Sequence, residues 1–167
     1  MNSPGKAEPL PGANAVSRLR VEAAGMVFVA ETHPDAPRTV AAFLALLPYR
    51  QRLIHVKWSG EATWIPLGEF ELGVGFENHT RHPSVGDFLF YPGGFSETEI
   101  LLAYGPCSFA SRMGPLAGNH FLTIVEGREH LKELGRKVLW EGAQEIVFSA
   151  LAQDVDVGRR TGTTARR

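Results

Sequence analysis

Two glutamates at the start of one strand-like stretch are the strongest candidates for chemistry. In Ser96-Glu97-Thr98-Glu99, a spacing of two places Glu97 and Glu99 on one face of an extended chain. Two carboxyl groups held close together raise the pKa of one of them, so the pair would supply an acid and a base, or a cation site. The preceding Pro92-Gly93-Gly94 favours close approach of a ligand to the backbone. The alternative interpretation is the charged outer face of a half-exposed strand.

A third carboxylate lies between two indoles. Glu61 stands between Trp58 and Trp64 in the sequence, and Ser59-Gly60 permits a tight turn there. Aromatic surface can raise the pKa of a carboxyl group by desolvation, as a general acid or base requires. The alternative is an exposed turn glutamate flanked by two core tryptophans.

Two histidines occupy predicted strands. His120 follows Asn119 into an apolar strand and could be a neutral base in a pocket, or a partly buried histidine with satisfied hydrogen bonds. His55 shares a strand face with Leu53 and would point into a barrel mouth or into solvent. The candidate catalytic residues are therefore Glu97, Glu99, Glu61 and His120, and the candidate ligand-binding residues are Trp58, Trp64, Asn119, Tyr104 and His55.

Metal and thiol chemistry find little support in the sequence. Glu77, His79 and His82 are the one group that resembles metal ligands, but they lie in a polar loop where histidines need no explanation. We expect no metal and no cofactor. Cys107 is the single cysteine, which excludes an intrachain disulfide and favours a reducing cytoplasm. It lacks an obvious local activator, so we expect an inert thiol.

Composition limits the class of partner. The 167 residues carry a formal net charge of -1, so nucleic-acid binding would lack its usual electrostatic contribution. Apolar runs are too short for a membrane span, and residues 1–15 contain no apolar signal region. We therefore expect one cytoplasmic domain over residues 16–151, preceded by a flexible arm (1–15) and followed by a flexible basic tail (152–167).

Apolar periodicity predicts a mainly β fold that positions these residues. The predicted strands span residues 16–22 and 26–30, joined in a hairpin at Ala24-Gly25, and residues 53–58, 86–91, 98–104, 121–125 and 145–150. The predicted helices span residues 35–47 and 128–140. Asp35 is the expected cap of the first helix, Pro48 its stop, and Gly135 a possible break in the second. Residues 64–75 suggest broken strands or bulges. Short strands with two helices favour a closed antiparallel barrel whose open ends the helices cover.

The order of these elements resembles that of cyclophilins. The resemblance rests on Asp35-Ala36-Pro37-Arg38-Thr39 opening the first helix, and on Val125-Glu126-Gly127 leading into the second. A closer resemblance is to a bacterial cyclophilin-like family of unknown function. It is carried by four stretches, residues 58–68, 91–99, 117–121 and 139–144. Both resemblances imply a cyclophilin-like β-barrel over about residues 16–150.

The resemblance does not extend to the isomerase site. Cyclophilins use an arginine on the strand after the first helix to polarise the prolyl amide, and residues 53–58 contain none. The Gln-Gly-Gly pattern that usually follows is also missing, replaced here by residues 64–68. Prolyl isomerase activity is therefore not expected, because activity resides in the site and not in the fold.

The sequence favours a pocket on the side of the barrel for a small polar metabolite. The opine synthase that makes cucumopine looks like a distant relative in fold, and it joins an amino acid to a keto acid without a cofactor. This likeness implies an amino acid or keto acid-like ligand and, for an enzyme, acid–base chemistry of the lyase or synthase kind. The alternatives are a prolyl isomerase-like peptide-binding module and a non-catalytic homo-oligomeric subunit.

Overall fold

The computed structural model describes residues 16–151, so the predicted N-terminal arm and basic tail lie outside the described residues. The strands are β1 (Arg18–Ala23), β2 (Met26–Thr32), β3 (Tyr49–His55), β4 (Gly60–Gly68), β5 (His79–Thr80), β6 (Asp87–Tyr91), β7 (Thr98–Cys107), β8 (Ala110–Ser111), β9 (Gly114–Pro115), β10 (Gly118–Glu126) and β11 (Gln144–Ala150). The helices are α1 (Pro37–Leu44) and α2 (Leu131–Glu141), and a 3-10 turn, η1 (Arg128–His130), precedes α2.

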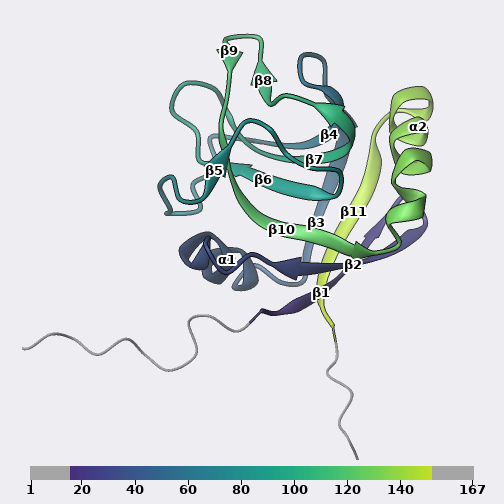
Figure 1. Ribbon diagram of the computed structural model, residues 1–167, viewed down its shortest axis with the longest axis horizontal. Helices are drawn as coiled ribbons and strands as arrows, with labels where there is room; N and C mark the ends of the chain where they lie inside the picture. The colour runs from purple at the N-terminus through teal and green to yellow at the C-terminus, as the bar shows by residue number, and fades with distance from the viewer. Residues whose placement is uncertain (1–15, 152–167) are drawn as a thin grey trace, which may run out of the picture.

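Within these residues the strands close into a barrel (Figure 1). Neighbouring strands follow the order β2-β1-β11-β3-β4-β7-β6-β10, and β10 pairs back with β2, so the eight-stranded ring has no open edge. All of these pairings are antiparallel, and β5 pairs with Gly118 and Asn119 at the start of β10, before the residues that pair with β2. The predicted closed antiparallel barrel is confirmed, and closure leaves no exposed edge to template aggregation.

The first hairpin follows directly from local sequence. Leu19, Val21 and Ala23 of β1 are buried while the residues between them are exposed, which is the period-two pattern of a strand with one buried face. The turn residues Ala24 and Gly25 both have positive φ, at 51° and 79°, as a two-residue hairpin loop of type I′ requires. The register of β1 on β2 is therefore fixed by burial and by the turn together.

Helix α1 closes one part of the barrel by inserting an aromatic ring. The side chain of Phe43 packs edge-on against Phe121 and Phe148, with ring centroids 5.0 and 5.1 Å apart. The helix ends at Leu44, four residues before Pro48, the predicted stop. The expected cap was wrong, because Ala36 occupies the N-cap position and Asp35 lies outside the helix.

Glu77, far along the chain, caps the N-terminus of α1. A Glu77 carboxylate oxygen accepts a hydrogen bond from the backbone N–H of Thr39 at 2.6 Å, and Arg38 donates to the same carboxylate at 3.0 Å. Burial favours a raised pKa at Glu77, but these hydrogen bonds and the Arg38 charge outweigh it and lower the pKa. The charged carboxylate thus stabilises the positive end of α1.

Helix α2 covers the barrel beside β3, β4 and β7 and runs unbroken through Gly135, so the predicted break does not occur. In Figure 1 it stands well apart from α1. A side-chain carbon at position 135 would lie 2.4 Å from the ring of Tyr104. The glycine therefore serves close packing of the helix on this ring.

We expect Gly135→Ala to destabilise the protein by about 1 to 2 kcal/mol, although alanine favours helix by about 1 kcal/mol. The added methyl group meets the Tyr104 ring at 2.4 Å, and overpacking of this kind costs more than the propensity gain. Urea denaturation followed by far-UV circular dichroism measures the difference. Lys132→Ala, on the exposed face of the same helix, is the matched control. A more stable Gly135→Ala protein would contradict the packing argument.

Strand β7 is buried on both faces, and this arrangement creates the setting of the candidate site. Its residues Ile100, Leu102 and Tyr104 join the central core, whereas Leu101 and Ala103 face outward. The outward residues belong to a second apolar cluster, which we call the outer cluster: Ala62, Leu89, Tyr91, Leu101, Ala103, Phe109 and Leu116. The segment that carries β8 and β9 supplies Phe109 and Leu116 and so covers this side of the barrel.

Candidate functional site

A pocket of about 650 Å³ opens on the side of the barrel next to the outer cluster. Residues 54–58 from the end of β3 and its following loop form one wall, residues 95–97 form another, and residues 110–113 of the β8–β9 hairpin form a third. Trp64 of β4 and Glu99 of β7 complete the lining. Five residues proposed from sequence line this pocket: His55, Trp58, Trp64, Glu97 and Glu99.

Strand register brings Trp64 and Glu99 together. Trp64 pairs with Leu101 and Pro66 pairs with Glu99 across the antiparallel β4–β7 ladder. Trp64 and Glu99 are therefore diagonal neighbours on the outer face of two adjacent strands. Residues far apart in sequence thus place an indole beside a carboxyl group.

The loop that carries Glu97 is held by a tyrosine hydroxyl. The backbone N–H groups of Phe95 and Ser96 both donate to the Tyr91 oxygen, at 3.1 and 3.2 Å. Gly93 precedes this loop with φ of 89°, and a side-chain carbon there would lie 2.8 Å from the hydroxyl oxygen of Thr98. Only glycine fits this close turn, as the Pro92-Gly93-Gly94 sequence suggested.

Glu99 is the most perturbed acid of the site. Its side chain is 5% exposed, and burial followed by the negative charge of Glu97 raises its pKa to about 8. No hydrogen bond or ion pair of its carboxyl group occurs within residues 16–151. Because no fully buried side-chain oxygen in that range lacks a partner, the Glu99 oxygens are open to the pocket. At neutral pH this group is a protonated acid beside the exposed carboxylate of Glu97.

The mouth of the pocket is apolar and carries two cations. Trp58, Phe95 and Met113 are each more than half exposed, and exposed apolar groups gathered at one place mark a binding surface. Lys57 and Arg112 line the pocket from different segments, and the Lys57 ammonium lies 6.0 Å from the centroid of the Trp58 ring. Sequence reasoning missed Lys57, Phe95, Arg112 and Met113, because exposed loop residues carry no periodic signal.

His55 is oriented by two hydrogen bonds. Its Nδ1 lies 2.7 Å from the Val56 carbonyl oxygen, which can only accept, so Nδ1 carries the proton. In the neutral ring Nε2 then accepts from the Tyr104 hydroxyl at 2.7 Å. Tyr104 itself lies outside the lining of the pocket. Burial and then the nearby Glu61 raise the pKa of Tyr104, so it stays a hydrogen-bond donor.

Glu61 is not brought into the pocket. It is exposed at the start of β4, and its side chain lies over the backbone of Gly105, where an added side-chain carbon would come within 1.7 Å of the Glu61 carboxylate. Its neighbour is therefore the Tyr104–Gly105 stretch and not the Glu97–Glu99 pair.

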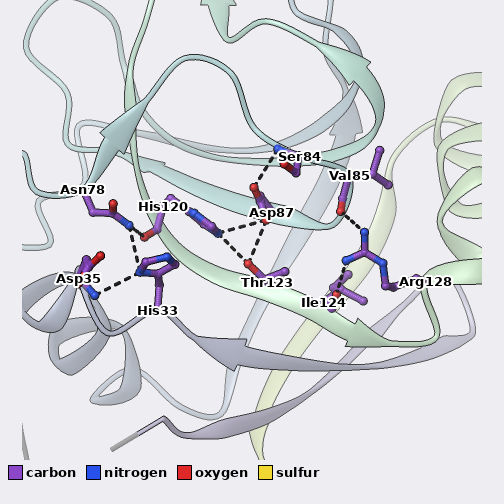
Figure 2. A network of polar contacts seen from close by, with 10 residues as sticks. All are labelled: His33, Asp35, Asn78, Ser84, Val85, Asp87, His120, Thr123, Ile124 and Arg128. Atoms are coloured by element: carbon purple, nitrogen blue, oxygen red, sulfur yellow. Dashed lines mark hydrogen bonds and ion pairs between the residues drawn. The ribbon is translucent and has the colours of Figure 1, made fainter. Parts of the chain in front are cut away.

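His120 lies in a separate polar network between β6 and β10 (Figure 2). Its Nε2 is 2.7 Å from the Thr123 hydroxyl and 3.1 Å from Asp87, and Thr123 donates to the same carboxylate at 2.9 Å. Burial would raise the pKa of Asp87, but the hydrogen bonds and charge of His120, with Ser84 and Thr123, lower it overall. His120 is thus a partly buried histidine with satisfied hydrogen bonds.

The same network extends to the chain before α1. The rings of His33 and His120 lie 4.6 Å apart, and the Asn78 amide donates to both His33 Nδ1 and the His120 carbonyl oxygen (Figure 2). The backbone N–H of Asp35 donates to the same His33 nitrogen. Burial, followed by the charge of His120, lowers the pKa of His33. The network ties the 69–80 segment and the start of α1 to the barrel wall.

Asn119 is completely buried and structural in its contacts. Its amide donates to the Thr39 hydroxyl at 3.0 Å and to the Gly75 carbonyl at 2.8 Å, and its oxygen accepts from the Glu77 backbone N–H at 3.0 Å. These bonds join β10, α1 and the loop before β5.

The possible metal ligands are not gathered. Glu77 caps α1, whereas His79 and His82 are exposed. In the described part of the chain no group of three or more His, Cys, Asp or Glu side chains is placed to hold a metal ion. Cys107 is half-buried, and burial followed by the charge of Asp87 raises its pKa to about 11, which disfavours the reactive thiolate.

Residues 16–151 therefore form a mainly β protein: a closed eight-stranded antiparallel barrel with two helices and a lateral pocket. Residues 19–150 match the family described as "Protein of unknown function (DUF3830)", and the chain belongs to that family. This confirms the expected membership of a family of unknown function. No curated protein matches the chain.

Two solved structures share the fold. One is McbB in complex with tryptophan, at 19% identity and a TM-score of 0.62, where the match covers 82% of this chain and 46% of McbB. The chain therefore spans less than half the length of McbB. The other is the hypothetical protein AF2241 from Archaeoglobus fulgidus, at 18% identity and a TM-score of 0.57, covering 85% of this chain and 100% of AF2241. None of the helices in residues 16–151 has the length and apolar run that crossing a bilayer requires.

Proposed function

We propose that the protein binds a small polar metabolite, of amino acid or keto acid type, in the pocket between β3, β4, β7 and the β8–β9 hairpin. The observation that carries this proposal is Glu99, a buried carboxyl group open to the pocket and without a partner in the described chain. Buried polar groups are normally paired, so a ligand is the natural partner. The solved complex of McbB with tryptophan supports a small-molecule ligand for a barrel of this fold.

The chemistry we propose is cofactor-independent acid–base catalysis. Glu99, whose raised pKa of about 8 lets it release or take up a proton near neutral pH, and the neighbouring Glu97 would exchange protons with the metabolite. Lys57 and Arg112 would pair with a carboxylate of the metabolite, and the aromatic groups would cover its apolar part. Such a site fits a lyase or synthase. The single cysteine of the protein, Cys107, suits the reducing cytoplasm.

A non-catalytic homo-oligomer remains the second candidate, and one surface favours it. Leu139 and Trp140 at the end of α2 are 50% and 77% exposed, an unusual exposure for large apolar side chains. Light scattering at increasing concentration tests this candidate, and a strict monomer would exclude it. A peptide-binding module has no comparable feature in its favour.

The pocket is tested by thermal-shift measurements with amino acids and keto acids. A ligand at one hundred times its Kd stabilises the folded state by about 2.7 kcal/mol, and we expect such a rise in Tm for at least one of these compounds. Glu97→Gln and Glu99→Gln should each reduce the rise. Glu69→Gln, an exposed glutamate outside the pocket, should leave it unchanged. An equal rise in all four proteins would remove the pocket from consideration.

A further inference from the structure

The lining around the Glu97–Glu99 pair favours a positively charged group. The two carboxyl groups share the pocket with three aromatic side chains, Trp58, Trp64 and Phe95. Aromatic faces attract cations, and an ammonium group offers three hydrogen-bond donors and no acceptor. A carboxylate placed at the same end would be repelled by the negative charge of Glu97.

Glu99, the buried member of the pair, has no partner in the described chain and is therefore available to a ligand cation. Glu99 is 5% exposed, lines the pocket and has no hydrogen-bond partner within residues 16–151. In this state only a proton neutralises it, because Lys57 and Arg112 enter from other segments and form no ion pair with it. A ligand cation that reached the Glu97–Glu99 pair would supply the missing partner.

We infer that the ligand carries a primary ammonium group that binds between Glu97 and Glu99 against the aromatic wall. Binding of this group displaces the proton that Glu99 holds in the free protein. This inference rests on the proposed function, because it assigns a ligand class to the same pocket. The exchange balances: the ammonium enters with its three protons, Glu99 becomes a carboxylate, and one proton leaves to solvent. The ligand end that meets the pair is therefore an amine and not a keto acid.

Three probes with one phenylethyl body separate the charges: 2-phenylethylamine, 3-phenylpropionate and 2-phenylethanol. Isothermal titration calorimetry at pH 7 should give an affinity for the amine at least tenfold above those for the acid and the alcohol. Repeating the titration in buffers of different ionisation enthalpy should show release of close to one proton per bound amine. Because the raised pKa of Glu99 lies near 8, the apparent affinity should rise about tenfold per pH unit between pH 5.5 and 7.5.

Variants make the outcome decisive. Glu99→Gln should still fold, lose the proton release and bind the amine with an affinity independent of pH, while Glu69→Gln should match the wild type. Equal binding of amine and acid, amine binding without proton release, or no amine binding at 10 mM would each overturn the inference. The proposed function has its own criterion: if the acid probe or a keto acid binds and Glu97→Gln or Glu99→Gln reduces that binding, the pocket stands and only the ammonium assignment fails.

Discussion

Replacing Asn119 with alanine is expected to lower the free energy of unfolding by about 3 kcal/mol. The substitution removes three hydrogen bonds of a completely buried side chain, and it leaves the buried Thr39 hydroxyl and the Glu77 N–H without this partner. An unsatisfied buried donor or acceptor costs about 1 to 3 kcal/mol, and the small cavity adds to this cost. Urea denaturation of the ligand-free protein measures the change.

A milder substitution on the same network provides the control. Thr39→Val keeps the shape of the side chain but removes the hydroxyl that accepts from Asn119, so its cost should be about 1 kcal/mol. A neutral surface substitution changes the free energy of unfolding by about 0.5 kcal/mol or less. If the free energy of unfolding of Asn119→Ala differs from that of the wild type by no more than this, the structural role assigned to Asn119 is wrong. Loss of ligand binding in that stable variant would then restore the ligand-binding role predicted from sequence.

Local pattern was sufficient for most of the barrel. The alternation in β1, the Ala24-Gly25 turn and the i, i+3, i+4 spacing of Val40, Phe43 and Leu44 each determine an element from adjacent residues. Strand ends were less accurate. Strand β3 begins at Tyr49, because its first residues pair with β11 from the far end of the chain.

The two errors in the helices have a common cause in long-range contacts. Asp35 had the right residue type for a cap, but Glu77 reaches α1 from another loop and takes that position. Gly135 had the composition of a helix break, but it is the contact point of Tyr104 from β7. Neither Glu77 nor Tyr104 is near these helices in sequence, so no local signal could indicate them.

In the candidate site too, some residues follow from the local sequence and others are placed only by long-range contacts. Glu97 and Glu99 were predicted to share a face, and both line the pocket because period-two geometry continues into β7. His120 and Asn119 adjoin in sequence but point into separate networks, since successive strand residues face opposite sides. The polar side chain of Asn119 bonds to Thr39 of α1, and that of His120 bonds to Thr123 and pairs with Asp87 of β6. Arg112 enters the site only because the β8–β9 hairpin folds over the barrel side.

Glu99→Gln is expected to make the protein more stable than the wild type at high pH and equally stable at low pH. The pKa of Glu99 is raised from 4.5 to about 8, so the folded state holds this proton more tightly than the unfolded state does. The resulting stability is fully present below about pH 4.5 and is lost as pH rises through about 8. Glutamine resembles the protonated acid and does not ionise, so the variant does not undergo this loss.

The difference should reach about 5 kcal/mol at pH 9, since the pKa of Glu99 rises from 4.5 to about 8 and each pKa unit corresponds to about 1.4 kcal/mol. Urea denaturation of both proteins at intervals from pH 4 to pH 9 measures it. Asp87 and His33 have lowered pKa values and therefore act with the opposite sign, weakening the fold as pH falls. They are present in both proteins and cancel in the difference. A stability difference that stays constant across this range would show that Glu99 is ionised in the folded state, and the proposed acid would then have no proton to give or to exchange.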